Sequence, residues 1–429
     1  MEEDHYSRYD CRLCGERNLE MVVPLGAVPV AGDFVGKEQL SLKQKLYPID
    51  IWRCRNESCG HFQLSEVVNP KILFPDNYSY FSGKSREIRE HFAEYAERVV
   101  KRFKLGEYAF VVDVGSNDGT LLEFFKEQGI NQVLGVDPAT KLAEYATDRG
   151  IRTIPSLFNS QIAERIKRSN GYADVVTANH VFAHTDDMIG MTNAIRTLMH
   201  DKSVFTFEVS YFPDVLDKML LGSILHEHLC YHTVKPLSAF LEKNRMELID
   251  VERTHIQGGS ITCTAQIKDG SYQKSETINQ MINMEVKRGM YGGNPVGDFN
   301  ERLNRARDNV KGLVEKILSE GKSIAGFGAA RGGTLLNYFF GLGEHMKFIV
   351  DDDPDKQGLY SPGQHIKVLP TARMYSDRPD YVAVLAWVHS KSIIRSHRRF
   401  VDEGGKFFTF LPEIKMIDKG NIADYLKSD

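Results

Sequence analysis

The sequence lacks the features of membrane, secreted and nucleic-acid-binding proteins. No stretch of its 429 residues approaches the roughly 18 uncharged apolar residues of a spanning helix. The N-terminus, MEEDHYSRYD, has no apolar core of a secretory signal. A formal net charge of −4 gives no broad basic surface. We therefore expect a cytoplasmic protein with no membrane and no nucleic acid among its partners.

Cysteine is scarce, and its few copies are clustered. Four of the six cysteines fall within the first 60 residues, as the pairs Cys11/Cys14 and Cys54/Cys59. In a reducing compartment, clustered cysteines bind metal more often than they form disulfides. Four thiolates can close a tetrahedral, structural zinc site, and His61 could replace one of them. The alternatives are two reduced thiol pairs or a redox dithiol at Cys11 and Cys14, which no βαβ pattern supports.

Beyond the cysteines, apolar segments with strand and helix spacing alternate, which predicts parallel sheets covered by helices. After a helix over 85–103, the expected strands are 109–114, 132–137, 173–177 and 203–207. Residues 272–320 are expected to be helical, with an interruption at 291–295, before strands at 323–327, 346–350, 381–387 and 406–410. The predicted domains are a zinc-binding module over 1–72, an α/β cofactor domain over 73–270 and a second, Rossmann-like α/β domain over 271–429.

The sequence DVGSNDG, residues 113–119, lies at the end of the first expected strand and contains a glycine turn. Glycine lets the backbone turn sharply and approach a ligand. The next strand ends in Asp137, whose carboxylate can accept hydrogen bonds from the hydroxyls of a ribose. Further glycines of a pyrophosphate-binding loop are missing, which favours S-adenosylmethionine over NAD. The candidate cofactor residues are Asp113, Gly115, Asn117, Asp118, Asp137, Asn179 and His180, whereas His184 is interpreted as an ordinary loop histidine.

An ordered set of motifs resembles one family, the sugar C-methyltransferases that act on nucleotide-linked keto-deoxysugars. The motifs are the four-cysteine module, NDGTLL at 117–122, HEHLCY at 226–231, GGS at 258–260, GFGAARGGTLLNY at 326–338 and DPDKQG at 353–358. The resemblance covers almost the whole chain. It implies a class I methyltransferase domain, S-adenosylmethionine as methyl donor and a small-molecule, nucleotide-linked acceptor.

The resemblance also implies a mechanism, in which a base removes a proton beside a sugar ketone and the resulting enolate carbon takes the methyl group. The family's proposed base is the second histidine of its His-Glu-His motif, here His228. Glu227 would orient the base or bind a sugar hydroxyl, His226 completes the motif, and Tyr78 or Tyr80 would lie near the sugar. The resemblance places substrate contacts at Tyr231, Ser260, Arg331 and Asn337.

Four positions depart from the family's pattern, and all are expected near the acceptor. They are Leu225, Thr262, Arg331 and Val388, where the family often has tyrosine, arginine, lysine and asparagine. An N- or O-methyltransferase is therefore an alternative, as is a non-catalytic binding protein. An NAD-dependent oxidoreductase is a third alternative, because a glycine-rich loop and Asp351 in the last domain resemble a dinucleotide fingerprint. We expect a monomer or a homodimer.

Overall fold

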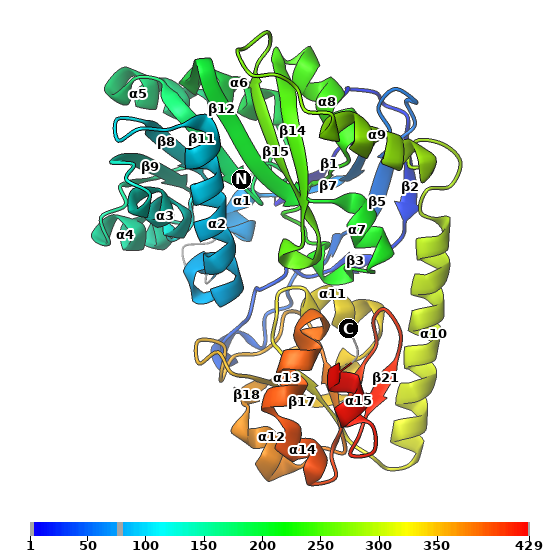
Figure 1. Cartoon of the computed structure of the whole chain (residues 1–429). Helices are drawn as coiled ribbons and strands as arrows, with labels where there is room; N and C mark the ends of the chain where they lie inside the picture. Colours follow the sequence, from blue (N-terminus) through cyan, green and yellow to red (C-terminus); the bar gives the residue numbers. More distant parts are fainter. Residues whose placement is uncertain (1–3, 75–79, 428–429) are drawn as a thin grey trace. The chain divides into compact units, whose positions relative to one another are not determined.

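The computed structural model describes residues 4–74 and 80–427 (Figure 1). The chain forms two compact units, each assembled from three separate segments. Unit 1 comprises Met1–Met21, Trp52–Asp214 and Glu227–Pro295, and unit 2 comprises Val22–Ile51, Val215–His226 and Val296–Asp429. The domain boundaries that we expect from the sequence, after residues 72 and 270, stay a prediction.

A seven-stranded sheet forms the centre of unit 1, in the order β10-β9-β8-β11-β12-β15-β14. Neighbours from β10 to β12 pair in parallel, while β15 is antiparallel to both β12 and β14. The strands are β8 (Phe110–Val114), β9 (Gln132–Asp137), β10 (Thr153–Pro155), β11 (Ala173–Asn179), β12 (Met199–Ser210), β14 (Met246–Thr254) and β15 (Ser260–Ile267). The four strands that we expect from the sequence in this region are confirmed as β8, β9, β11 and β12.

Helices cover both faces of this sheet because neighbouring residues of a strand point to opposite sides. On β8, Val111 packs into the apolar cluster of α2, α3 and α4, whereas Val112 packs into that of α5, α6 and α8. The helices are α2 (Arg86–Phe103), α3 (Thr120–Glu127), α4 (Thr140–Asp148), α5 (Ser160–Asn170), α6 (Met188–Leu198), α8 (Val234–Lys243) and α9 (Thr277–Lys287). Both sides of each parallel strand are thereby buried, as in α/β proteins generally.

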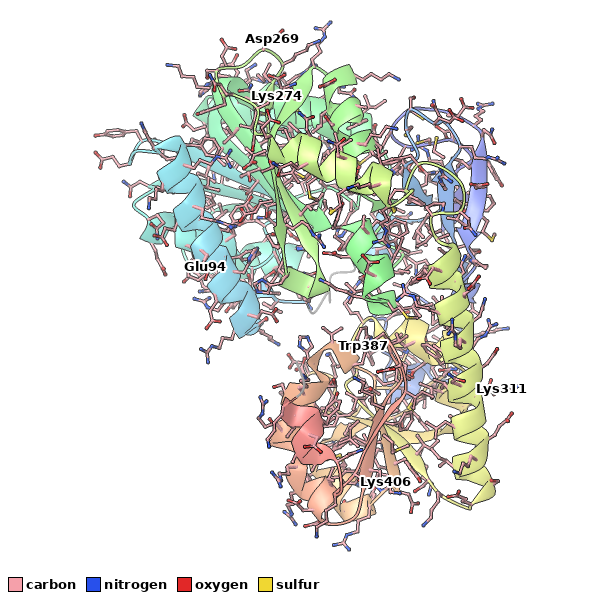
Figure 2. All side chains as sticks on the ribbon, turned by 45° about the vertical axis from the view of Figure 1, so that its right-hand side comes forward. Glu94, Asp269, Lys274, Lys311, Trp387 and Lys406 are labelled. Atoms are coloured by element: carbon pink, nitrogen blue, oxygen red, sulfur yellow. The ribbon has the colours of Figure 1, made fainter. Side chains whose placement is uncertain are left out.

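The expected helix over 85–103 is confirmed as α2. The Ser85 side chain accepts a hydrogen bond from the Ile88 N–H at 3.3 Å, which caps the first turn. Lys104 ends the helix in a left-handed conformation, with φ of 52°. Glu94, on the exposed face of α2, is labelled in Figure 2.

A second, four-stranded sheet has the order β13-β6-β5-β2. Its strands are β2 (Leu19–Val23), β5 (Ile51–Cys54), β6 (Phe62–Leu64) and β13 (Cys230–Tyr231). Beside it, β1 (His5–Ser7) pairs with β7 (Glu66–Val68), and α1 (Pro70–Leu73) follows. A strand from the middle of the chain, β13, therefore completes the sheet of the N-terminal cysteine region.

Unit 2 contains a six-stranded sheet in the order β18-β17-β16-β19-β20-β21, of which only β21 is antiparallel. The strands are β16 (Ile324–Phe327), β17 (Met346–Asp351), β18 (Val368–Pro370), β19 (Tyr381–Val384), β20 (Lys406–Thr409) and β21 (Lys415–Ile417). The helices are α10 (Gly297–Ser319), α11 (Gly333–Phe339), α12 (Ala372–Asp377), α13 (Ser390–Ser396), α14 (Arg398–Asp402) and α15 (Ile422–Lys427). This arrangement agrees with the expected second, Rossmann-like α/β part.

The expected strand over 381–387 is too long. β19 ends at Val384, and Trp387–His389 form a 3₁₀ turn. Ala386 packs closely on the glycine loop after β16, where a Cβ on Gly328 would lie 2.8 Å from the Ala386 Cβ. The chain turns there instead of extending the sheet.

Smaller elements connect the main ones. They are β3 (Ala27–Val28), β4 (Tyr47–Pro48), α7 (Phe212–Asp217) and the 3₁₀ turns Lys37–Gln39, Ser82–Lys84, Leu221–Ser223, Ile256–Gly258 and Gly343–His345. None of the helices that the structure describes is long and apolar enough to cross a membrane.

Candidate active site

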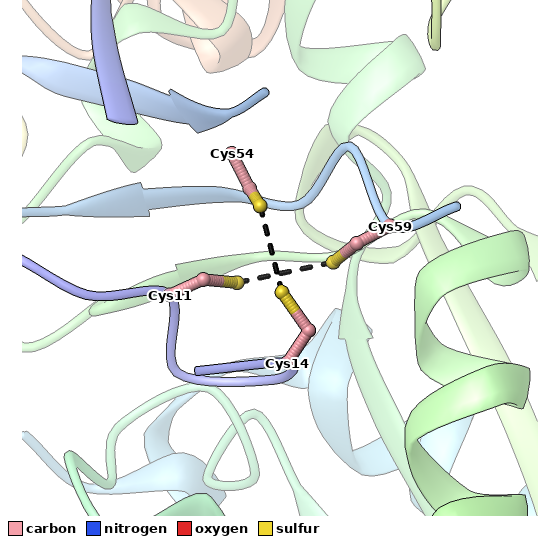
Figure 3. A group of neighbouring side chains, drawn as sticks. All are labelled: Cys11, Cys14, Cys54 and Cys59. Carbon is pink, nitrogen blue, oxygen red and sulfur yellow. Dashed lines mark hydrogen bonds between the residues drawn. The ribbon is translucent and has the colours of Figure 1, made fainter. Parts of the chain in front are cut away.

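Four cysteine side chains of unit 1 point toward one another (Figure 3). Their Sγ atoms all lie within 4.8 Å, with 3.8 Å between Cys11 and Cys59 and 3.6 Å between Cys14 and Cys54. Hydrogen bonds from Cys11 and Cys59 lower the pKa of Cys54, which favours its thiolate form. Four soft thiolate donors at this spacing fit a closed, structural zinc site. Among the described residues this cluster holds cysteines alone, so His61 is not needed as a ligand.

The carboxyl ends of the parallel strands in unit 1, called here the cofactor edge, carry the expected glycine turn. Gly115 has a φ of 72°, and its N–H donates to the Val136 carbonyl at 2.7 Å. Asn117, also left-handed with φ of 51°, donates its N–H to Asp137 Oδ2 at 2.8 Å. Asp137 Oδ1 accepts from the Ala139 N–H at 2.9 Å. Asp137 is thus held at the end of β9, and each of its carboxylate oxygens keeps a lone pair for another donor.

Asp113, near the end of β8, is a buried carboxyl group. The Thr177 hydroxyl donates to its Oδ1 at 2.6 Å. Burial raises the pKa of Asp113 to about 7, against the effect of this hydrogen bond, and the charge of Asp137 raises it further. A bound cation would favour the ionised form of Asp113.

A short segment before α2 is tied to the glycine turn. The Ser82 N–H donates to Asn117 Oδ1 at 2.9 Å, and the Gly83 N–H donates to Asp118 Oδ2 at 2.8 Å. In return, Asn117 Nδ2 donates to the Tyr80 carbonyl at 2.9 Å. These bonds bring Tyr80, predicted to lie near the substrate, to the cofactor edge. Tyr78, the other candidate, lies outside the described residues.

A buried glutamate at the same edge joins two histidines, and the sequence reasoning missed it. Glu208 of β12 is fully buried, with His180 Nε2 3.0 Å from its Oε1 and His91 Nε2 3.0 Å from its Oε2. The Thr262 hydroxyl donates to Oε2 at 2.9 Å. Burial raises the pKa of Glu208, but hydrogen bonds from His180 and His91 and their charges lower it well below its usual range. The predicted cofactor residue His180 is thereby held in one orientation.

Asn179 is the last residue of β11, directly before His180. The end of β11 at the cofactor edge agrees with the place that we expect for it, and its cofactor contact stays a prediction.

The candidate base lies beside a histidine that we had interpreted as an ordinary loop residue. The imidazole rings of His228 and His184 are stacked, with centroids 5.0 Å apart and an interplanar angle of 14°. The Cys230 N–H donates to the Ala183 carbonyl at 3.2 Å, which ties the two loops together. Glu227 is 3% exposed and therefore able to act only within this buried region. His184 is thus a residue of the candidate site, and only the folded chain shows it.

His226 belongs to unit 2, although it precedes Glu227 in the sequence. It is fully buried, and its Nε2 lies 3.1 Å from the Tyr47 carbonyl. The Tyr47 ring meets the imidazole edge to face, with centroids 5.9 Å apart. These contacts give His226 a packing role within unit 2, and its catalytic role stays a prediction.

The predicted substrate residues are divided between the two units. Tyr231 and Ser260 are buried in unit 1, where the Ser260 hydroxyl donates to the Ile256 carbonyl at 3.1 Å. In unit 2, Asn337 is 4% exposed on α11. Arg331 lies against Gly32, where an added Cβ would be 3.2 Å from Arg331 Nη1. Their substrate contacts stay predictions.

The glycine-rich loop of unit 2 is closed by the same type of hydrogen bonds as the cofactor turn of unit 1. Gly328, with φ of 96°, donates its N–H to the Val350 carbonyl at 2.8 Å. The Ala329 N–H donates to Asp351 Oδ2 at 2.6 Å. Both loops therefore have the form that is typical of nucleotide-binding folds. This form alone does not show whether the loop of unit 2 binds a ligand.

The sheet order of unit 1, with the reversed strand β15 inserted before the last strand, and the acidic side chain that ends β9 define a class I S-adenosylmethionine-dependent methyltransferase. Comparisons with known proteins agree. Residues 86–250 match the model of a "Methyltransferase domain", residues 11–74 that of a "Putative zinc binding domain" and residues 255–412 that of a "C-methyltransferase C-terminal domain".

A relative of known name extends the match over nearly the whole chain. C-methyltransferase NovU of Streptomyces niveus is 32% identical over 409 residues, which cover 95% of this chain and 96% of that protein. The chain belongs to this C-methyltransferase family and uses S-adenosylmethionine as methyl donor. The family resemblance seen in the sequence is confirmed.

Two solved methyltransferase structures are similar to part of this chain. One is an S-adenosylmethionine-dependent methyltransferase of Clostridium acetobutylicum, 11% identical, with a TM-score of 0.35, covering 42% of this chain and 92% of the other. Another is the 1,6-didemethyltoxoflavin-N1-methyltransferase of Burkholderia thailandensis, 19% identical, with a TM-score of 0.32, covering 44% of this chain and 83% of the other.

Proposed function

We propose that the protein methylates the carbon beside the ketone of a nucleotide-linked keto-deoxysugar, with His228 as general base. The proposal is supported by the stacked His184–His228 pair, which is partly buried in the methyltransferase unit. The sequence resemblance to sugar C-methyltransferases supports the acceptor class.

Methyl transfer to carbon requires a carbon nucleophile, unlike transfer to nitrogen or oxygen. A carbon beside a ketone becomes nucleophilic when a base removes its proton and the electron pair moves into the enolate. His228 takes this proton, and the enolate carbon then forms a bond to the methyl carbon as the bond from methyl to sulfur breaks. The products are a C-methylated sugar, S-adenosylhomocysteine and the proton on His228, which passes to solvent.

Histidine suits this task because its pKa lies near physiological pH. The neighbouring His184 ring restricts the His228 imidazole to one plane, and buried Glu227 provides a carboxylate on the same segment. Tyr80, tied to the cofactor edge, is placed in this proposal beside the sugar. Arg331 of unit 2 provides a planar guanidinium suited to the oxygens of a nucleotide's phosphates.

The test is the variant His228→Ala, assayed with a nucleotide-linked keto-deoxysugar. We expect methyl transfer to fall by roughly 10²–10⁴-fold, the usual contribution of a positioned base. Deuterium exchange from solvent into the carbon beside the ketone should fall by a similar factor. Affinity for S-adenosylhomocysteine, measured by calorimetry, should stay unchanged.

A matched control is His200→Ala, which removes a half-exposed imidazole near the start of β12. The cofactor edge lies at the other end of this strand. It should leave transfer, exchange and cofactor affinity as in the wild type. Normal exchange in His228→Ala would assign the proton transfer to another residue. Absence of exchange in the wild type would refute the carbon-acid mechanism, and the N- or O-methyltransferase alternative would then be preferred.

A further inference from the structure

The residue that follows the first zinc ligand is a buried cation, and nothing assigned so far explains it. Arg12 is 2% exposed, and its side chain is fully enclosed. Its Nε donates to Asp186 Oδ1 at 2.9 Å. Its Nη1 donates to the carbonyl of Leu64 and, at 3.4 Å, to that of Leu229. The guanidinium thus spans from the cysteine cluster to the residue next to His228.

The segment that carries His228 is also attached to β6. The Leu229 carbonyl also accepts from the Leu64 N–H at 3.0 Å, and Cys230 pairs with Gln63 in the short β13–β6 ladder. Gln63 in turn accepts the Arg12 N–H at its Oε1, at 2.9 Å. Backbone and side chain of Arg12 therefore both bind the strand on which the His228 segment rests.

The four cysteines of the zinc site lie on or next to the same elements. Cys11 directly precedes Arg12, Cys54 ends β5, and Cys59 stands three residues before β6. Metal binding at such a site holds chain segments that would otherwise be independent. The path from the metal to the candidate base is thus Cys11, Arg12, the Leu229 carbonyl and His228.

The carboxylate of Asp186 completes the arrangement. Burial raises the pKa of Asp186, but the charge of Arg12, the Tyr6 hydrogen bond and Arg8 lower it below its usual range. A buried guanidinium needs such an anion, because an unpaired buried charge is strongly unfavourable. Arg8 binds the same residue, with Nη1 3.0 Å from Asp186 Oδ1 and 2.7 Å from its carbonyl, and no bond joins Arg8 to the His228 segment among the described residues.

We propose that Arg12 is a positioning residue that couples the zinc site to His228, so that the zinc-binding module serves proton abstraction. The proposal rests on the role of His228 proposed above. Zinc and Arg12 hold the segment 227–231 in one position, and loss of either lets that segment move. A displacement of about 1 Å in a catalytic group can cost on the order of 10²-fold in rate.

The experiment compares Arg12→Lys with Arg8→Lys in the full-length, zinc-loaded protein. Lysine keeps the charge and the partner Asp186 but loses the forked geometry that reaches the Leu64 and Leu229 carbonyls. Backbone hydrogen–deuterium exchange of the peptide 227–232 is measured without acceptor, together with zinc content, S-adenosylhomocysteine affinity and kcat with a keto-sugar acceptor. The same exchange is measured on the wild type after zinc chelation, which needs no variant to fold.

In Arg12→Lys we expect exchange at 229–231 to rise by at least ~10-fold, because local opening governs amide protection. We expect kcat to fall by ~10²-fold, with one zinc retained and cofactor affinity unchanged. Chelation should raise exchange of the same peptide, and Arg8→Lys should resemble the wild type in all four measurements.

Unchanged protection of 227–232, in Arg12→Lys or after chelation, would overturn the proposal. Faster amide exchange with a normal kcat would also overturn it, since the coupling would then not reach the reaction. If the wild type transfers no methyl group to any keto-sugar, the proposed function fails, while the amide measurements still decide whether zinc and Arg12 hold the segment.

Discussion

Gly115 in the turn after β8 allows a sharp test of how the cofactor edge is built. Its φ of 72° belongs to the left-handed region, which L-residues enter only with strain. An alanine Cβ at this position would also lie 2.3 Å from Val181 Cγ2 and 3.0 Å from its Cγ1. Gly115→Ala therefore imposes two separate costs, one on the backbone and one on packing.

The first cost is about 1–2 kcal/mol, for a side-chain-bearing residue in the left-handed conformation. The second is about 1–3 kcal/mol, for an inserted carbon in a packed interior. The free energy of unfolding should thus fall by about 2–5 kcal/mol in urea titrations. Gly129→Ala is the matched control, because its φ is 89° but no heavy atom lies within 4 Å of the added Cβ. It should show the first cost alone.

Cofactor affinity separates local distortion from general loss of stability. If the turn moves to relieve the contact, cofactor binding must restore its original conformation, and the cost of doing so lowers the affinity. An affinity loss of ~10-fold corresponds to about 1.4 kcal/mol. Val181→Ala combined with Gly115→Ala removes both Cγ atoms and leaves the Val181 Cβ 3.1 Å away, so it should recover part of the affinity. Equal stability losses in Gly115→Ala and Gly129→Ala, with wild-type cofactor affinity in both, would refute this reasoning.

Two further predictions concern buried ionisable groups. Cys54→Ser should lower the zinc content from about one per chain, because a structural site needs all four ligands; full zinc retention by metal analysis would contradict it. Asp113 has an ordinary pKa of 3.8 and a folded-state pKa of about 7, so the cofactor-free folded protein binds a proton that the unfolded chain releases. The contribution of Asp113 to the free energy of unfolding should therefore be largest below about pH 4 and should fall as the pH rises toward 7. Denaturant titrations of Asp113→Asn should lose this slope, and an identical slope in both proteins would show that another group titrates.

Local patterns allowed much of the fold to be predicted. Short apolar runs, the first of them rich in β-branched residues, predicted β8 and β9, and cysteine spacing alone indicated the zinc site. Asp137 could be placed at the cofactor edge because it ends an expected strand, and the carboxyl ends of parallel strands meet at one edge of the sheet. Each of these features depends on residues close together in the sequence.

The remaining features depend on strand order, which the sequence pattern does not reveal. Glu208 meets His91 only because β12 lies beside β11 and α2 covers that face, although a lone glutamate within an apolar strand is a usable signal. His184 meets His228 in a region where β13 pairs with β6 in the register Cys230↔Gln63, although these two residues are 167 positions apart in the sequence. Such pairings between distant segments are set by tertiary packing.

The charges at the cofactor edge bear on which residues accelerate the reaction. S-adenosylmethionine carries a sulfonium cation, and methyl transfer removes this charge from sulfur. A carboxylate near this cation stabilises the charged reactant at least as well as the transition state. We therefore expect Asp137 to contribute to cofactor binding and little to rate. Asp137→Ala should therefore weaken cofactor binding by about 1.5–3 kcal/mol, the range for a charged hydrogen-bond partner, while kcat at saturating cofactor stays within a few-fold of the wild type. His228→Ala should show the opposite division, a lower kcat with unchanged cofactor affinity. If Asp137→Ala instead lowers kcat and kcat/KM by the same factor, its carboxylate acts in the transition state, and the assignment of the rate enhancement to the His228 segment is wrong.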